Sequence, residues 1–230
     1  MTLRLDQFVM AMLPMLAACA TPRASVAPPC SELITKWPGW LYLGDYDAVE
    51  VLQLAELPQP VQEALTSHLR TRLGDAVFSE LVFEGGQVID HAALLRADPL
   101  AADYQWTVPA YVLHFVLSRP ESCLDAYHAD IWLDEVGRPI QEIDLPAVAA
   151  QGGVLRIVSV DQARAAVRAL GHAGELPAEI AYRPDLDTLV WLITPSDADV
   201  KEGPVIRFVE VVIDARDGRV LASEKREAIE

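Results

Sequence analysis

Two stretches of the chain alternate between apolar and polar side chains, and both lead to the same short motif. Residues 127–140 read YHADIWLDEVGRPI, and residues 208–220 read FVEVVIDARDGRV. A period of two is typical of a β-strand with one buried face. Each strand reaches an aliphatic residue followed by Asp (Asp134 and Asp214), crosses a short turn to Gly-Arg and begins a return strand. The repeat predicts two modules that contain the same hairpin.

A helical pattern precedes each hairpin. In residues 60–73 the apolar side chains recur every four positions, and Gly74 follows as a helix end. In the second half, Ser159 and Gln162 have the spacing of a capping box, in which each side chain satisfies a backbone amide of the first turn. The predicted buried stripes are Val61, Leu65, Leu69 and Leu73 in the first helix, and Ala163, Ala166, Val167 and Leu170 in the second.

The other apolar runs predict strands. In the first half these are residues 77–83, 87–89, 106–117 and 126–134, with Gly85-Gly86 as a turn and residues 91–103 as a loop or short helix. In the second half they are residues 179–182, 188–194, 205–214 and 219–223, with the charged residues 224–230 as a solvated end. The pattern therefore predicts an α+β fold of two tandem modules, each a helix packed on an antiparallel β-sheet.

Stretches rich in Pro and small residues divide the chain into parts. The predicted parts are a leader at 1–18, a tether at 19–36, a first module at 37–146, a linker at 146–153 and a second module at 154–230. The aromatic run WPGWLY at 37–42 predicts an entry segment that packs against the first module.

The leader contains an apolar run, residues 8–18, that is too short to span a bilayer. The run ends in Leu16-Ala17-Ala18-Cys19, which resembles the lipobox of bacterial lipoproteins. The resemblance implies cleavage before Cys19 and a diacylglycerol on its thiol, and several acyl chains anchor a domain durably. An ordinary secretory leader, cut at Ala18 or Ala20, is the alternative. Because Ala20 is not Asp, we predict an outer-membrane anchor that faces the periplasm.

The net charge of the chain is −16 at pH 7. Nucleic acid is excluded as a partner, because phosphates require a footprint of Lys and Arg. The charge also disfavours adhesion of the folded part to anionic lipid. A net negative charge would attract a basic protein partner or a cation. The same charge is equally consistent with a role in solubility alone.

Cys30 and Cys123 are the two thiols that remain after the leader and Cys19. In an oxidising compartment a disulfide between them would stabilise the fold by a few kcal/mol. Two separate buried thiols are the alternative, because the sequence gives no geometry. No CxxC pair and no closely spaced His/Cys set occurs. We therefore predict no metal site and no cofactor.

The second module resembles a known family. The segments VSVDQARAAVRALG, LVWLIT and VVIDARDGRV, within residues 158–223, resemble a PepSY domain. The resemblance implies a helix on a small antiparallel sheet, similar in shape to cystatins. It also implies a non-enzymatic role in binding or restraining extracytoplasmic proteins, including peptidases. The first module departs from this pattern, because Glu135-Val136 follows Asp134 where the motif has Ala.

Candidate functional residues lie on the faces of the strands that point away from the helices. In the first module these residues are Trp106, His114, His128, Asp130 and Trp132. In the second module they are Phe208, Glu210 and Val212, opposite the core candidates Val211 and Ile213. A solvated sheet, a protein-binding face, and a metal or catalytic site are all open interpretations. Asp134 and Asp214 are predicted to cap turn amides.

No G-x-S-x-G, H-E-x-x-H, P-loop or G-x-G-x-x-G motif occurs, so we predict that the protein is not an enzyme. The leading hypothesis is a lipid-anchored, periplasm-facing adaptor or inhibitor of another envelope or secreted protein. A structural envelope lipoprotein that self-associates through Phe208 and Val212 is the first alternative. An immunity-type inhibitor of a basic cell-wall hydrolase is the second, and an enzyme using His114 and His128 is the weakest.

Overall fold

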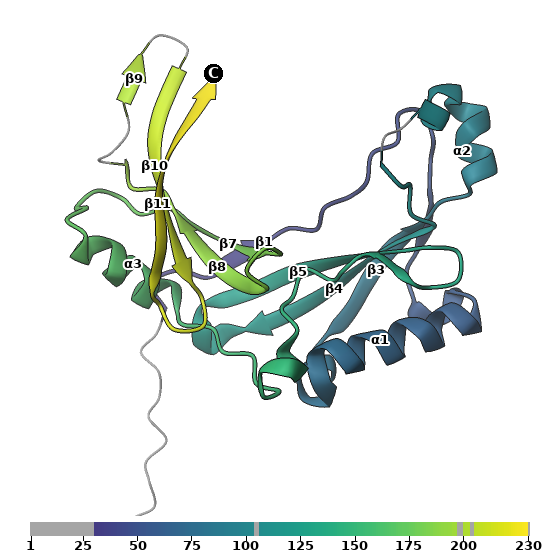
Figure 1. The fold of residues 1–230 in the computed structure, drawn as a ribbon, viewed down its shortest axis with the longest axis horizontal. Helices are drawn as coiled ribbons and strands as arrows, with labels where there is room; N and C mark the ends of the chain where they lie inside the picture. Colours follow the sequence, from purple (N-terminus) through teal and green to yellow (C-terminus); the bar gives the residue numbers. More distant parts are fainter. Residues whose placement is uncertain (1–29, 104–105, 197–199, 203–204, 230) are drawn as a thin grey trace, which may run out of the picture.

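A computed structural model of the chain describes residues 30–103, 106–196, 200–202 and 205–229. The predicted leader and the lipidation site predicted at Cys19 lie outside these residues. The described residues form two β-sheets set at an angle to each other, and each sheet carries a helix (Figure 1). The predicted α+β class with two helix-on-sheet modules is therefore confirmed.

The first sheet comes from the first half of the chain. Its strands are β1 (Ile34–Lys36), β2 (Val49–Val51), β3 (Val82–Val88), β4 (Tyr111–Arg119), β5 (Leu124–Leu133) and β6 (Pro139–Gln141). In space the order is β1-β5-β4-β3-β2, and β6 also pairs with β5. The sheet is antiparallel except at its edge, where β1 joins β5 in parallel. Short helices connect the strands: η1 (Leu54–Glu56), α2 (His91–Ala97), η2 (Pro99–Asp103) and η3 (Pro120–Ser122).

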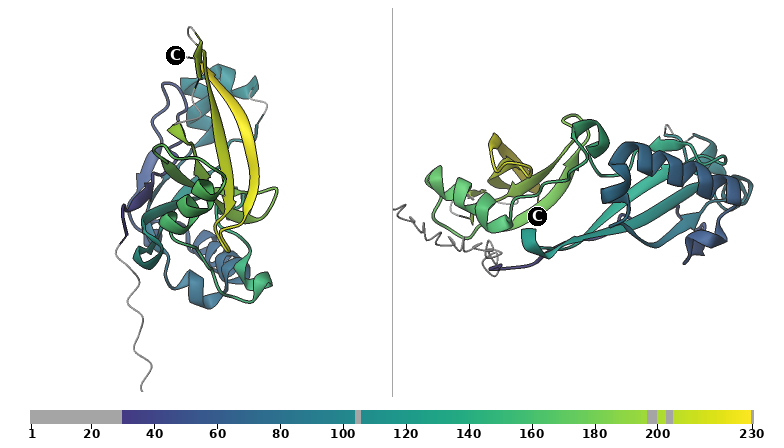
Figure 2. Two further views of the ribbon diagram at one scale, coloured as in Figure 1. Left: turned by 90° about the vertical axis from the view of Figure 1, so that its left-hand side faces the viewer. Right: turned by 90° about the horizontal axis from the view of Figure 1, so that it is seen from below.

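Helix α1 (Gln59–Phe78) lies across one face of this sheet (Figures 1 and 2). Its predicted stripe is buried, and the stripe continues to Val77. Gly74 breaks the helical backbone with φ 77° and ψ 159°, but a further turn follows it. The strand predicted at 77–83 is therefore wrong in its first half. Val77 lies in the helical turn after Gly74 and is buried, so it adds to the same core.

The turn predicted at Gly85-Gly86 is also wrong, because both glycines lie within β3. The pairing of β3 with β4 shifts register between Phe83 and Gly85, which is typical of a bulge. A Cβ on Gly86 would lie 2.5 Å from the carbonyl oxygen of Val112. These glycines therefore allow close approach of two strands, and they do not reverse the chain.

Strands β4 and β5 place the predicted core residues as expected. Tyr127, Ala129, Ile131 and Leu133 alternate along β5 and are fully buried. His114 pairs directly with Asp130, and Val116 pairs with His128. The polar residues of β5 and His114 therefore share the sheet face opposite α1, as the alternation predicted.

The second sheet has the strand order β11-β10-β8-β7, and β9 also pairs with β10. Its elements are α3 (Val160–Ala169), β7 (Ala178–Arg183), β8 (Thr188–Ile193), β9 (Val200–Glu202), β10 (Val205–Asp214) and β11 (Val220–Ile229). The capping box of Ser159 and Gln162 is present at the start of α3. Leu170 is 52% exposed, so its predicted burial is wrong.

The charged end predicted at 224–230 is exposed at residues 225–228, as expected, but residues 224–229 also belong to β11. Residues up to Ile229 pair with β10, and the last pair joins Ile229 to Val205. Only residues 211–214 of β10 also pair with β8. The open end of the β10–β11 hairpin therefore projects beyond β8 and β7, and β9 pairs with β10 at that end (Figure 1).

The two modules share one continuous hydrophobic core. Leu65 of α1, Ile131 of β5, Val167 of α3 and Trp191 of β8 belong to the same buried cluster. The connection between the modules contains the short helix η4 (Val148–Gln151), which contacts α1. Strand β1 also contacts β7, so the two sheets meet along this edge.

Candidate functional site

The N-terminal residues of the described chain cover the face of the first sheet that lies opposite α1. We call residues 30–42 the strap. The strap starts at Cys30, forms β1 and then crosses above the sheet toward α2 (Figure 1). It is the feature that decides how exposed the predicted site residues are.

Side chains of the sheet hold the strap in place. The Gly39 N–H donates a hydrogen bond to Asp130 Oδ2 at 2.9 Å. Gln87 makes two bonds to Leu41: its Oε1 accepts from the Leu41 N–H at 3.0 Å, and its Nε2 donates to the carbonyl at 3.3 Å. A Cβ on residue 39 would lie 3.0 Å from Asp130 Oδ2, so glycine permits the close approach.

Two histidine–carboxylate pairs lie beneath the two tryptophans of the strap. His114 Nδ1 is 2.7 Å from Asp130 Oδ1, and the His114 ring is 4.6 Å from the ring of Trp40. His128 Nδ1 is 2.5 Å from a carboxylate oxygen of Glu84, and its ring stacks on Trp37 at 6.1 Å.

The exposed face predicted for the first module is therefore wrong at three residues. His114, His128 and Asp130 are only 1%, 5% and 7% exposed. Trp132 is partly buried, and Trp106 packs near it with the ring centroids 6.1 Å apart. The strand alternation was correct, but it could not show that the strap covers this face. The sequence features that point to this cover are the aromatic run at 37–42 and the isolated Gly39 within it.

The strap also contacts the second module through α3. The Ser31 N–H donates to Asp161 Oδ2 at 3.0 Å, and the Ser31 hydroxyl donates to Asp161 Oδ1. Arg164 Nη2 lies 2.5 Å from a carboxylate oxygen of Glu32. The side-chain and backbone hydrogen bonds from Ser31 hold the pKa of Asp161 below its ordinary value. We call these contacts of Ser31 and Glu32 with α3 the clasp.

Cys30 and Cys123 form a disulfide, with their Cα atoms 5.5 Å apart. Cys123 immediately precedes β5, and Cys30 is the first residue of the strap. Of the two possibilities that the sequence left open, the structure has the bonded one. The bond fixes the strap to the end of the first sheet, next to the clasp.

A polar network joins the modules on the other side of the core. Arg72 Nη2 of α1 donates to the Tyr182 hydroxyl at 2.9 Å, to Asp187 Oδ1 at 3.1 Å and to the Leu145 carbonyl at 2.9 Å. Burial and the hydrogen bond to Asp187 raise the pKa of Tyr182 to about 12. A hollow of about 590 Å³ adjoins this network, lined by Arg72, Gln141, Glu142, Asp144, Tyr182, Pro184 and Asp187.

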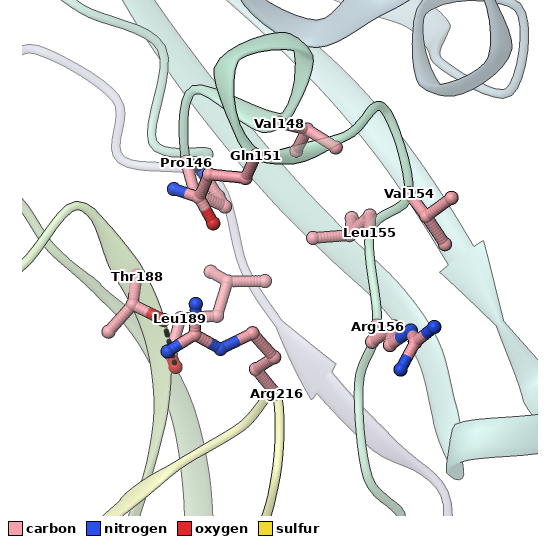
Figure 3. Close-up of a pocket in the computed structure, with 9 residues that line it drawn as sticks. All are labelled: Pro146, Val148, Gln151, Val154, Leu155, Arg156, Thr188, Leu189 and Arg216. Atoms are coloured by element: carbon pink, nitrogen blue, oxygen red, sulfur yellow. Dashed lines mark hydrogen bonds between the residues drawn. The ribbon is translucent and has the colours of Figure 1, made fainter.

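A smaller cavity of about 20 Å³ lies between the inter-module connection and β8 (Figure 3). Pro146, Leu155, Leu189 and Arg216 are among its lining residues. A water needs roughly 10–15 Å³ of such space, so this cavity is too small for a substrate. It is a gap in the packing between the modules.

The predicted face of the second module is only partly exposed. Phe208 and Glu210 lie in the projecting hairpin and are half-buried, and Glu210 pairs with Arg226 at 3.0 Å. Val212 is 1% exposed, so its predicted place on an open face is wrong. It lies in the inner part of β10, where β8 flanks the strand. Val211 and Ile213 are buried as predicted.

Asp134 and Asp214 cap the turns that follow their strands. Asp134 Oδ1 accepts from the N–H groups of Val136 and Arg138, at 3.0 and 2.8 Å. Asp214 Oδ1 accepts from the Arg216 N–H at 2.8 Å. Slight burial would raise the pKa of Asp134, but the hydrogen bonds from Arg138 and Val136 outweigh it and lower that pKa.

Within the described part of the chain, no group of three or more His, Cys, Asp or Glu side chains could hold a metal ion. None of the helices described is both long enough and apolar enough to cross a membrane.

Comparison with known proteins identifies the class of the second module. Residues 157–224 match the family described as "Peptidase propeptide and YPEB domain", which is PepSY. The resemblance predicted for residues 158–223 is thus confirmed, and the chain contains a PepSY domain. A crystal structure of a "putative lipoprotein" from Clostridium difficile 630 is similar at 18% identity, over 50% of this chain and 72% of that chain, with a TM-score of 0.23. No curated protein matches the sequence.

Proposed function

We propose that the protein is a non-catalytic extracytoplasmic binding protein, anchored by lipid on Cys19, that acts as an adaptor or inhibitor of another envelope or secreted protein. The observation that carries this proposal is the PepSY domain at residues 157–224 with its projecting β10–β11 hairpin. The LAAC sequence that ends at Cys19 supports the lipid anchor, and Ala20 supports an outer-membrane location facing the periplasm.

The contacts of the candidate catalytic groups also favour binding over chemistry. His114 and Asp130 bond to each other, and Trp40 and Gly39 of the strap cover them. A general base must reach a substrate within hydrogen-bond distance, and this pair lies under the strap. The histidines of the first sheet therefore serve packing beneath the strap.

The hairpin is the surface that we assign to the partner. Residues 205–210 of β10 pair with β11 outside the part of the sheet that β8 flanks. Phe208 adds partly exposed apolar area there, and the outer edge of β11 has no strand beside it within the described residues. Such an edge can accept an extended segment of another protein by strand addition.

A photo-crosslinking amino acid at position 208 of the full chain, in intact cells, tests this proposal. We expect a discrete crosslinked product with a second protein. The control is the same amino acid at Leu170, which is 52% exposed at the end of α3, and it should give no such product. Equal products at both positions, or none at position 208, would refute the assignment to the hairpin.

The crosslinked species also separates the competing functions. A product of twice the mass of the chain would favour the self-associating structural lipoprotein. The charge of −16 favours an inhibitor of a basic hydrolase as a second candidate. Its complex should weaken as salt rises, because salt screens charge pairs at a protein interface. Salt-independent affinity would exclude that candidate.

A further inference from the structure

Tryptophans gather on one side of the first module. Four of the five in the chain lie on the strap or next to the sheet face that it covers, and the fifth, Trp191, is buried in the second module. Trp37 and Trp40 of the strap are 76% and 54% exposed, and Tyr42 is 84% exposed. We call Trp37, Trp40 and Tyr42 the aromatic ridge.

The ridge follows closely on the residues that would carry the lipid. Residues 20–29 separate Cys19 from Cys30, and a chain of that length reaches at most about 40 Å. The disulfide to Cys123 fixes Cys30 at the start of the strap, and Trp37 comes directly after β1. A lipid on Cys19 therefore keeps the ridge within reach of the bilayer surface.

We propose that the aromatic ridge rests in the headgroup layer of a phospholipid bilayer and so orients the anchored protein. This inference relies on the proposed lipid anchor. Trp and Tyr rings favour the membrane–water interface, because each ring has an apolar body and a polar group. The extended strap presents these rings without burying them, since each is more than half exposed.

The contact is aromatic and not electrostatic. Residues 37–47 contain no Lys or Arg, and they include Asp45 and Asp47. A basic cluster would select anionic lipid. This segment should instead prefer a zwitterionic surface, and its binding to the bilayer should weaken as anionic lipid is added. The affinity of three rings can be low, because the anchor makes the contact intramolecular and raises its effective concentration.

The ridge and the partner surface lie on different modules. The ridge belongs to the first module, whereas β10 and β11 rise from the second sheet, at the opposite end of the molecule from α2 (Figure 1).

Quenching of tryptophan fluorescence by brominated phosphatidylcholine tests the inference. The full chain, carrying its anchor, is reconstituted into brominated and unbrominated vesicles, and flotation measures how much protein stays with the lipid. We expect a loss of emission in brominated vesicles. The triple variant Trp37→Ser, Trp40→Ser, Tyr42→Ser should float equally well and lose this quenching. Leu186→Ser, at an exposed apolar residue of the second module, should behave as the native chain does.

The outcomes separate the ridge from the anchor. Flotation without quenching would overturn the ridge contact and leave the anchor intact. If the native chain failed to float, the anchor would be wrong, and the ridge would then be judged by quenching in excess vesicles, whose absence would overturn it as well. Quenching that persists in the triple variant would overturn the assignment to these three residues. Circular dichroism of each variant confirms that it is folded.

Discussion

Asp130 connects the sheet to the strap because each of its oxygens has a different partner. Oδ1 faces His114 Nδ1, and Oδ2 accepts from the Gly39 N–H. Both contacts are shielded from water, since Asp130 is 7% exposed and His114 is 1% exposed. Removing the carboxylate would leave an imidazole and a backbone amide without their partner, which costs more than the bonds themselves contribute.

Asp130→Ala should therefore lower the free energy of unfolding by about 3 kcal/mol. Asp130→Asn should cost less, because an amide can still accept from Gly39. Urea denaturation followed by circular dichroism measures both. Asp125→Ala provides the control, since Asp125 is an exposed residue on the same strand, and its effect should stay within about 0.5 kcal/mol. Equal midpoints for Asp130→Ala and Asp125→Ala would contradict the role of Asp130.

The strap is the element that the sequence predicts least completely. The run WPGWLY indicated packing against the first module, and that much is correct. Its position on the sheet depends on contacts between residues about ninety positions apart, such as Gly39 with Asp130, which no local period reveals. By contrast, α1, α3, β4 and β5 follow from periodicity and capping, because those signals are local. Gly86 was misread because a close approach of strands and a turn both favour glycine.

The clasp between the strap and α3 should depend on pH. The pKa of Asp161 is held below its ordinary value of 3.8 by the bonds from Ser31. A carboxyl with a depressed folded-state pKa adds stability above its ordinary pKa and loses it as the pH falls through the folded value. The native chain should thus melt at a higher temperature than Ser31→Ala at pH 7, and this difference should shrink below about pH 4.

Thermal melting of the two chains at several pH values between 3 and 7 gives the measurement. The difference in melting temperature between Asp161→Asn and Ser31→Ala should not change with pH in this way, because Asp161→Asn lacks the carboxyl that accepts the bonds from Ser31. A melting difference that stays constant down to pH 3 would mean that Asp161 does not carry the clasp.

At the scale of the whole molecule, the two modules are packed around one core. One hydrophobic cluster extends from α1 to β8, and the disulfide, the clasp and the Arg72 network surround it. The repeated hairpin motif predicted two modules but not this shared core. The reason is physical: a buried stripe specifies that a helix face is covered, and not which element covers it. The polar joint at Arg72 involves residues more than seventy positions apart, so no motif marks it.

Arg72 is the residue by which the joint between the modules can be tested. Its side chain is 15% exposed, and its guanidinium binds Tyr182 and Asp187 of the second module together with the Leu145 carbonyl. Arg72→Ala removes the charged donor that these acceptors share, and Asp187 keeps only its bonds from the Tyr182 hydroxyl and neighbouring amides, so we expect a loss of about 2 kcal/mol in unfolding free energy. Arg72→Lys should recover only part of it, because an ammonium cannot match the planar fork of arginine.

The same helix supplies a matched control for the joint. Arg70 is 58% exposed, and its ion pair with Asp75 spans 3.7 Å. Exposed pairs of this kind contribute at most about 1 kcal/mol, so Arg70→Ala should have a smaller effect than Arg72→Ala. Urea denaturation followed by fluorescence and by circular dichroism measures both changes.

The fluorescence and circular dichroism signals should coincide during unfolding of the native chain, because modules with a common core unfold together. Separate transitions in the native chain would show that the modules unfold independently, and equal losses in the two variants would show that Arg72 does not join them.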